Sequence, residues 1–131
     1  MPTMLKRILG VEAAIFLAAA ALHSERLSTG YEHPQASVAE MAIGVVLLAC
    51  VAAIFLFPRR RRAIALGAQT FAILGTLVGL SLIFAGIGPQ TTLDLVIHGI
   101  MVVTVFFGML WTSGRITGKG GGSSMTDWER R

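Results

Sequence analysis

Four apolar runs, each close to the length that crosses a lipid bilayer, constrain this chain more than any other feature. They cover residues 4–23, 38–57, 63–87 and 93–112. A helix needs roughly 20 mostly apolar residues to span the hydrocarbon, and the runs lack the alternation of a membrane β-barrel. Pro58 ends the second run, and two glycines and a proline at 86–89 separate the third from the fourth. We therefore predict an all-α, integral membrane four-helix bundle in residues 1–112.

The composition excludes several classes of protein. Hydrophobic residues make up 54% of the 131 residues and charged residues 14%, whereas a soluble domain has about 25% charged residues. A chain this short cannot bury such an excess in one core surrounded by water, which excludes a soluble enzyme. Cys50 is the single cysteine, so an internal disulfide or a CxxC redox pair is excluded as well. No nucleophile–base spacing stands out, and we do not expect the chain to be an enzyme on its own.

Lysine and arginine are distributed very unevenly between the two sides of these spans. If the N-terminus is cytoplasmic, Arg26 alone among the 11 basic residues lies outside. Such a bias is typical of bacterial-type cytoplasmic membrane proteins and predicts that both termini lie inside. The net charge of +4 then reflects residues that meet anionic lipid headgroups, and it does not indicate nucleic-acid binding. The cytoplasmic basic residues are Lys6, Arg7, Arg59, Arg60, Arg61, Arg62, Arg115, Lys119, Arg130 and Arg131.

Residues 113–131 form a tail that is rich in glycine and serine. This composition predicts a flexible cytoplasmic segment after the fourth span. Similar stretches also serve as engineered linkers, and the sequence leaves both origins open. A partner protein that binds the tail, through Trp128 for example, is a further hypothesis.

The third span carries a stripe of small residues on one helical face. Ala68, Ala72, Gly75, Gly79 and Gly86 follow each other at helical spacings. Small residues let helix backbones approach closely in a bilayer, where lipid tails compete for ordinary apolar contacts. We expect this stripe, centred on Gly75 and Gly79, to pack against the second or the fourth span. Homo-oligomerisation through the same stripe is the alternative.

The polar residues inside or beside the spans gather toward the outer face. His23 ends the first span, Glu40 and Asp94 lie near the outer starts of the second and fourth, and His98 follows Asp94 by one helical turn. Ionisable groups are costly in a bilayer and are therefore functional candidates. These four residues are candidates for one outer pocket that binds a ligand, and the sequence leaves open whether they converge.

Three ligands suit such a pocket. Facing imidazoles of His23 and His98 would hold haem iron, and a histidine with a carboxylate would hold a divalent metal. A neutral His98 hydrogen-bonded to a quinone carbonyl is the third hypothesis. The structural alternative is that Glu40 and Asp94 cap their helices, since Ser37-x-x-Glu40 and Thr91-x-x-Asp94 have the spacing of capping boxes. His98 would then bond only Asp94 or a neighbouring helix.

Glu12 is the acidic residue that lies in the cytoplasmic half of the predicted spans. It lies about two helical turns into the first span, and Gln69 lies at a comparable depth in the third. We predict an interhelical hydrogen bond between a protonated Glu12 and Gln69. The alternative is a proton path from Glu12 outward to Glu40 and His98.

One stretch of the sequence resembles a known family. Ala39-Glu40-x-x-x-Gly44-x-x-Leu47-Leu48, an arginine-rich turn and an Ala/Gly-rich third span are similar to the DoxX-like superfamily over residues 35–80. The resemblance implies a small four-helix membrane protein, with some relatives linked to quinone-coupled or thiol-linked redox systems. Glu40 is the one position to which it would carry a functional role.

Three functions fit these observations. The first is a small multi-pass subunit or accessory protein that packs against other membrane subunits or against further copies of itself. The second is a membrane redox component that binds haem, a metal or a quinone through His98, His23, Glu40 and Asp94. The third is a small oligomeric transporter or channel whose polar route includes Glu12, Gln69, Glu40 and His98.

Overall fold

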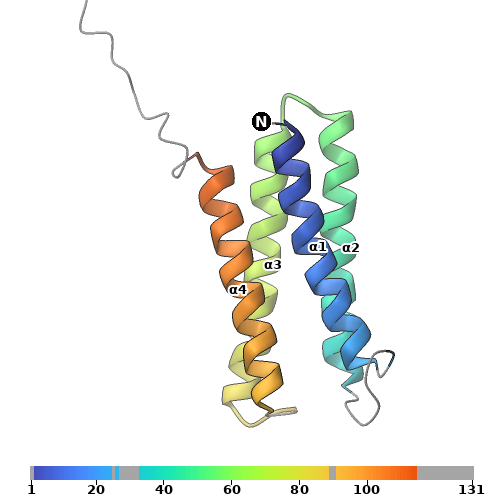
Figure 1. Cartoon of the computed structure of the whole chain (residues 1–131), viewed down its shortest axis with the longest axis vertical. Coiled ribbons are helices and arrows are strands. Elements are labelled where there is room, and N and C mark those ends of the chain that lie inside the picture. Colours follow the sequence, from blue (N-terminus) through green and yellow to red (C-terminus); the bar gives the residue numbers. More distant parts are fainter. Residues whose placement is uncertain (1, 25, 27–32, 89–90, 115–131) are drawn as a thin grey trace, which may run out of the picture.

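The computed structural model describes residues 2–24, 26, 33–88 and 91–114. Within these residues the chain is all-helical and has four helices: α1 (Pro2–His23), α2 (Pro34–Leu56), α3 (Arg61–Phe84) and α4 (Thr92–Thr112). Successive helices run antiparallel, and α4 returns to pack beside α1 (Figure 1). The predicted tail at 113–131 lies outside the described residues, apart from 113 and 114.

The bundle has two chemically distinct ends. The first turns of α1 and the turn between α2 and α3 lie at the same end (Figure 1). The amino group of Lys6 on α1 lies 3.2 Å from the centre of the Phe55 ring at the end of α2, which links the two. We call this the arginine end, since it carries Arg7 and Arg59–Arg62. The opposite end, where α1 finishes and α4 begins, carries the three histidines and is called the histidine end.

The start of α2 differs from the prediction. Helix α2 begins at Pro34, and His33 caps it by accepting a hydrogen bond from the Ala36 amide at Nδ1, 3.1 Å away. Proline suits the first helical position because the amide it lacks would be unpaired there. Ser37 is therefore not an N-cap, and the predicted capping box with Glu40 is wrong. The Ser37 hydroxyl instead donates to the carbonyl of Ala20 on α1 at 2.8 Å.

The turn between α3 and α4 follows from its glycines. Helix α3 ends at Phe84, where the amides of Gly86 and Ile87 bond back to Ile83 and Leu82. Gly86 and Gly88 have φ angles of 79° and 90°, which favour glycine. Gly86 thus belongs to the turn, and the small-residue stripe on α3 does not extend to it.

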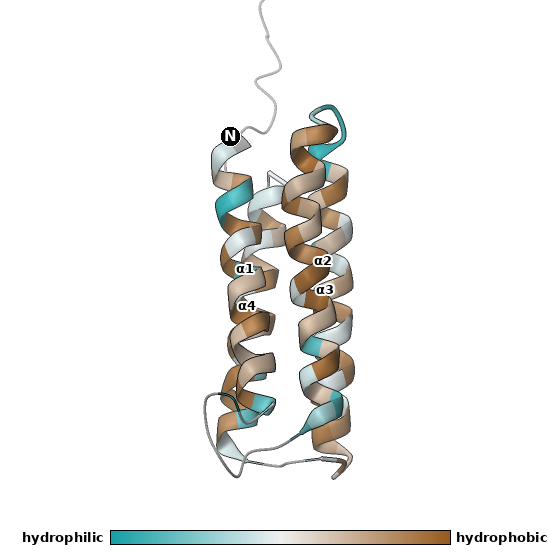
Figure 2. Ribbon diagram, turned by 90° about the vertical axis from the view of Figure 1, so that its right-hand side faces the viewer, coloured by the Kyte–Doolittle hydropathy of each residue, from teal (hydrophilic) through white to brown (hydrophobic). Residues whose placement is uncertain are grey.

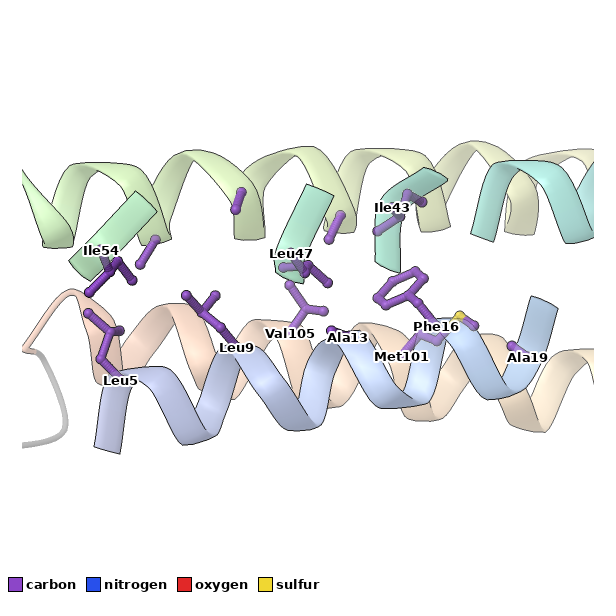
Figure 3. Packing of buried hydrophobic residues seen from close by; sticks show 13 residues of the cluster. Leu5, Leu9, Ala13, Phe16, Ala19, Ile43, Leu47, Ile54, Met101 and Val105 are labelled. Carbon is purple, nitrogen blue, oxygen red and sulfur yellow. The ribbon is translucent and has the colours of Figure 1, made fainter. Parts of the chain in front are cut away.

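The core lies along the axis of the bundle (Figure 3). Leu5, Leu9, Ala13 and Phe16 recur at spacings of four and three residues, so they form one buried stripe on α1. The buried apolar residues of α3 are all alanines, which lets its neighbours approach. Other members of the core are Ala19, Ile43, Leu47, Ile54, Ala65, Ala68, Ala72, Met101 and Val105.

The glycines of the α3 stripe meet neighbours within the chain. A Cβ atom on Gly75 would lie 2.7 Å from the Ile43 side chain of α2, and one on Gly79 would lie 3.0 Å from His98 Nε2 of α4. Both glycines therefore let another helix come close. Intramolecular packing thus occupies the two positions at the centre of the stripe.

The outside of the bundle is apolar along most of its length (Figure 2). Large side chains such as Leu56, Leu74 and Phe107 are more than half exposed. Three helices, α2, α3 and α4, are long and apolar enough to cross a membrane. Helix α1 is of similar length, but Lys6, Arg7 and Glu12 make it less apolar.

Candidate functional site

Three helices contribute side chains to one hydrogen-bonded group at the histidine end. His23 Nδ1 lies 2.7 Å from Glu40 Oε2 of α2, and His23 Nε2 lies 3.1 Å from Asp94 Oδ1 of α4. All three side chains are almost completely buried. The sequence left open whether these residues converge, and the structure brings them within hydrogen-bonding distance. We call them the His23 cluster.

Local structure holds Asp94 in this cluster. Thr91 caps α4, and the two residues form the capping box that the sequence predicted. Asp94 Oδ2 accepts hydrogen bonds from the Thr91 amide at 3.1 Å and from its hydroxyl at 2.7 Å. One carboxylate oxygen therefore caps the helix while the other meets His23. Asp94 thus both caps α4 and orients the His23 imidazole.

Counting hydrogens limits the charge states that the His23 cluster can adopt. A carboxylate oxygen accepts but does not donate, so two hydrogen bonds to carboxylates require two hydrogens. A doubly protonated His23 supplies both, and the cluster then holds one positive and two negative charges. Charges of opposite sign this close compensate each other, which reduces the cost of their burial.

His98 is held by the backbone of α4. Its Nδ1 lies 2.8 Å from the carbonyl oxygen of Asp94, one turn earlier. A carbonyl oxygen only accepts, so Nδ1 carries the hydrogen of this bond. The Nε2 atom on the other side of the ring lies against Gly79 and makes no hydrogen bond within the described part of the chain.

A cavity of about 190 Å³ lies beside His98, between α2, α3 and α4. Its wall is mostly apolar, and its polar lining comes mainly from the histidines and Asp94. Gly79 and His98 both line it, so the Nε2 edge of the imidazole borders this space. The lining residues are His23, His33, Gln35, Ala36, Ala39, Gly75, Val78, Gly79, Leu82, Ile83, Ile87, Asp94 and His98.

His33 is a residue of this site that the sequence did not predict. Its backbone amide donates to the His23 carbonyl at 2.8 Å, and its ring packs edge-on against that of His23. A Cβ atom on Gly88 would lie 2.6 Å from His33 Nε2, so glycine is required beside the ring. The proline after His33 was the available signal, because it favours a helix start whose preceding residue is the cap.

The donor set does not suit a metal or a haem iron held by two histidines. Both ring nitrogens of His23 already face carboxylate oxygens, so neither lone pair is available to a metal. His98 Nδ1 is committed to a carbonyl, which leaves one nitrogen. Among the described residues, no group of three or more His, Cys, Asp or Glu side chains is arranged to hold a metal ion.

A second polar pair is buried nearer the arginine end. Gln69 Nε2 donates to Glu12 Oε1 at 2.9 Å, so the predicted hydrogen bond between these helices is present. Gly108 of α4 closes over the pair, since a Cβ atom there would collide with Glu12 Oε1 and lie 2.7 Å from Gln69 Nε2. The remaining oxygens, Glu12 Oε2 and Gln69 Oε1, have no hydrogen-bond partner among the described residues.

Apolar residues separate this pair from the His23 cluster. Glu12 and His23 are 11 positions apart on α1, or about 16 Å at the helical rise. Ala13, Phe16 and Ala19 lie between them on the buried face, packed against Met101 and Leu47 (Figure 3). On α1 the buried side chains between the two polar sites are therefore apolar, while on α3 the buried Thr76 hydroxyl donates to the Ala72 carbonyl of its own helix.

Comparison with known proteins returned no relative. No protein family, no curated protein and no solved structure matches this chain significantly.

Proposed function

We propose that this chain is a small membrane protein that binds a neutral, single-ring ligand in the cavity at its histidine end. The observation that carries the proposal is His98 Nε2, a ring nitrogen that borders the cavity without a hydrogen-bond partner in the described chain. His98 as a residue is buried, and its Nε2 edge borders the cavity, where a molecule can reach it and pair with it. A ligand in the cavity would supply that partner.

The size and lining of the cavity support a ligand of this class. Apolar protein cavities of about 150 Å³ bind a benzene ring, and this one measures about 190 Å³. Leu82, Ile83 and Ile87 offer an apolar surface, while His98 offers a single polar contact. Such a combination of apolar walls and one oriented polar group is typical of small-molecule sites. Of the predicted cofactors, a quinone-type ring suits these dimensions, and a haem macrocycle is too large.

The distribution of charge supports an orientation in the bacterial-type cytoplasmic membrane. We propose that α1 crosses the membrane together with α2, α3 and α4, with the arginine end inside. Lys6, Arg7 and Arg59–Arg62 would then meet the cytoplasmic headgroups. The exposed apolar side chains around the bundle would face lipid, which would explain why they are not buried.

Cysteine labelling tests this orientation. In a Cys50→Ala background, Arg60→Cys and Thr92→Cys place single thiols at the arginine end and the histidine end. A membrane-impermeant maleimide added to intact cells should label the second variant, and should label the first only after the membrane is permeabilised. Labelling of Arg60→Cys in intact cells would contradict the orientation.

Ligand binding is tested with 4-methylphenol as the probe, titrated into the purified protein in nanodiscs. Gly79→Ala would place a methyl group against His98 Nε2, so we expect its affinity to fall about tenfold or more. Gly67→Ala on the same helix has open space around its Cβ atom and should bind like the wild type. If the wild-type protein and Gly79→Ala bind the probe equally, or neither binds it, the proposed site is wrong.

A groove between α1 and α4 favours a second candidate function, that of an accessory subunit in a larger membrane complex. The groove measures about 500 Å³ and is lined by apolar side chains that include Ile8, Val11, Phe107 and Trp111. A membrane helix of another subunit would fill it with the close packing that bilayers favour. Purification in mild detergent should then recover a partner, and Val11→Trp, which fills the groove, should release it. A chain that purifies alone from native membranes would exclude this function.

A further inference from the structure

The backbone of α4 determines whether His98 donates or accepts hydrogen bonds in the cavity. We call this the hydrogen-bonding polarity of the cavity. A histidine beside a cavity can donate or accept, depending on which nitrogen holds the hydrogen. Here Nδ1 faces the Asp94 carbonyl at 2.8 Å and must be the donor. In the neutral imidazole, Nε2 therefore keeps its lone pair and presents an acceptor to the cavity.

The neighbouring polar groups do not reverse this polarity. Both nitrogens of His23 face carboxylates, so its hydrogens are engaged within the His23 cluster. The carboxylate of Asp94 is itself an acceptor, engaged by His23 and by Thr91. His33 also lines the cavity, and because its Nδ1 accepts from the Ala36 amide, its neutral ring carries a hydrogen on Nε2. A donor is thus present at the His33 side of the cavity, whereas His23 and Asp94 supply no hydrogen at the His98 side.

From this polarity we infer that the cavity selects a ring that donates a hydroxyl hydrogen to His98 Nε2. The inference rests on the proposed function and names its ligand class: an aromatic alcohol or diol, in preference to the corresponding ketone, dione or ether. A carbonyl oxygen in the same position would bring its lone pairs against the lone pair of Nε2. The sequence-based hypothesis of a quinone carbonyl bonded to neutral His98 thus changes to its reduced, hydroxyl-bearing form.

This preference has a consequence for a ligand that exists in both redox forms. A site that binds an aromatic diol more tightly than the dione stabilises the reduced member of the couple. A tenfold preference corresponds to a rise of about 30 mV in the two-electron potential of the bound couple. The chain would then act on the redox balance of such molecules by selective binding.

The inference is tested with two matched pairs of probes on the wild-type protein in nanodiscs, without oxygen. The first pair is trimethylhydroquinone and trimethylbenzoquinone, and the second, which is redox-inert, is 4-methylphenol and 4-methylanisole. We expect the hydroxyl-bearing member of each pair to bind about tenfold or more tightly, because the other leaves Nε2 unpaired. Equal binding within either pair, or tighter binding of the dione, would overturn the inference and leave the proposed function standing. If no probe binds, the proposed function fails as well.

A variant and a spectroscopic measurement assign the preference to His98. His98→Phe keeps a ring of similar width and removes the acceptor, so both members of a pair should bind with affinities within about threefold of each other. Nitrogen NMR of the wild-type histidines reports the same atom without a substitution. In the free protein Nε2 should carry no hydrogen, and its signal should move when 4-methylphenol binds. A hydrogen on Nε2 in the free protein, or retained selectivity in His98→Phe, would overturn the inference.

Discussion

The two ends of the bundle bury ionisable groups in opposite ways. At the histidine end, His23 bonds two acids from two other helices, Glu40 and Asp94. Toward the arginine end, Glu12 has one hydrogen bond to Gln69, a neutral side chain. In the His23 cluster, a protonated imidazole offsets the charge of the two carboxylates. In the other pair, the Gln69 amide offers the Glu12 carboxyl group no opposite charge. We therefore expect the His23 cluster to be held together by ions and the Glu12 pair by neutral groups, which the substitutions below test.

The two ends also differ in how completely their polar atoms are paired. In the described chain, the His23 cluster leaves one side-chain atom without a partner, Glu40 Oε1. The other end leaves Glu12 Oε2, Gln69 Oε1 and Thr112 Oγ1. Close packing by Gly108 compensates there, because it brings a third helix onto the pair. We therefore expect polar substitutions to matter most at the histidine end and steric ones at the other.

The largest effect is expected from removing the centre of the His23 cluster. His23→Ala leaves the carboxyl groups of Glu40 and Asp94 buried near each other without the imidazole between them. Breaking a buried ionic group in this way costs about 3–5 kcal/mol. The free energy of unfolding, measured by SDS titration in bicelles, should fall by that amount. A loss under about 1 kcal/mol, the range of an exposed ion pair, would show that the cluster is not a compensated ionic network.

A smaller but still large effect is expected from a steric change at the other end. Gly108→Ala places a methyl group against Glu12 Oε1 and Gln69 Nε2. Overpacking of this kind costs about 1–3 kcal/mol. Gly99→Ala on the same helix is the matched control, since its Cβ atom has nothing within 4 Å. If both variants unfold at the same SDS concentration, the Glu12 pair is not closed by α4 as the structure shows.

An intermediate effect is expected from the capping box that positions Asp94. Thr91→Ala removes a hydroxyl that both caps α4 and donates to Asp94 Oδ2 at 2.7 Å. Loss of an N-cap costs about 1 kcal/mol. The unfolding free energy should fall by this amount, and Thr92→Ala, one residue later, serves as the control. Equal stability of the two variants would mean that the cap does not hold Asp94 in the cluster.

Much of the fold follows from the sequence because hydropathy and turn residues act locally. The apolar runs, Pro58 and the glycines near 86–88 predict four helices, and the spacing of Thr91 and Asp94 predicts a cap. Antiparallel helices of similar length also bring the end of α1, with His23, beside the starts of α2 and α4. These features need no knowledge of how the helices are rotated about their axes.

The remaining features depend on that rotation, which a single sequence does not specify. The sequence does not show that His23, rather than His98, meets both carboxylates, or that His98 turns its Nδ1 to the backbone. The wrong cap at Ser37 has a local cause. Ser37 and Glu40 have the spacing of a capping box, but the helix has already begun before them. Pro34 is the residue that marks the true helix start.

The smallest effect is expected from Glu12→Gln, and comparing it with the same substitution at Glu40 is the most direct test of the difference between the two ends. Glu12→Gln keeps the shape of the side chain and an oxygen that accepts from Gln69, so the unfolding free energy should change by less than about 1 kcal/mol. Glu40→Gln removes a charge from the hydrogen bond to His23 and should cost about 1.5–3 kcal/mol. The difference arises because an amide replaces a carboxylate well beside a neutral partner and poorly beside an imidazolium. If Glu12→Gln costs as much as Glu40→Gln, Glu12 is held as an ion, and a charged partner must then lie near it.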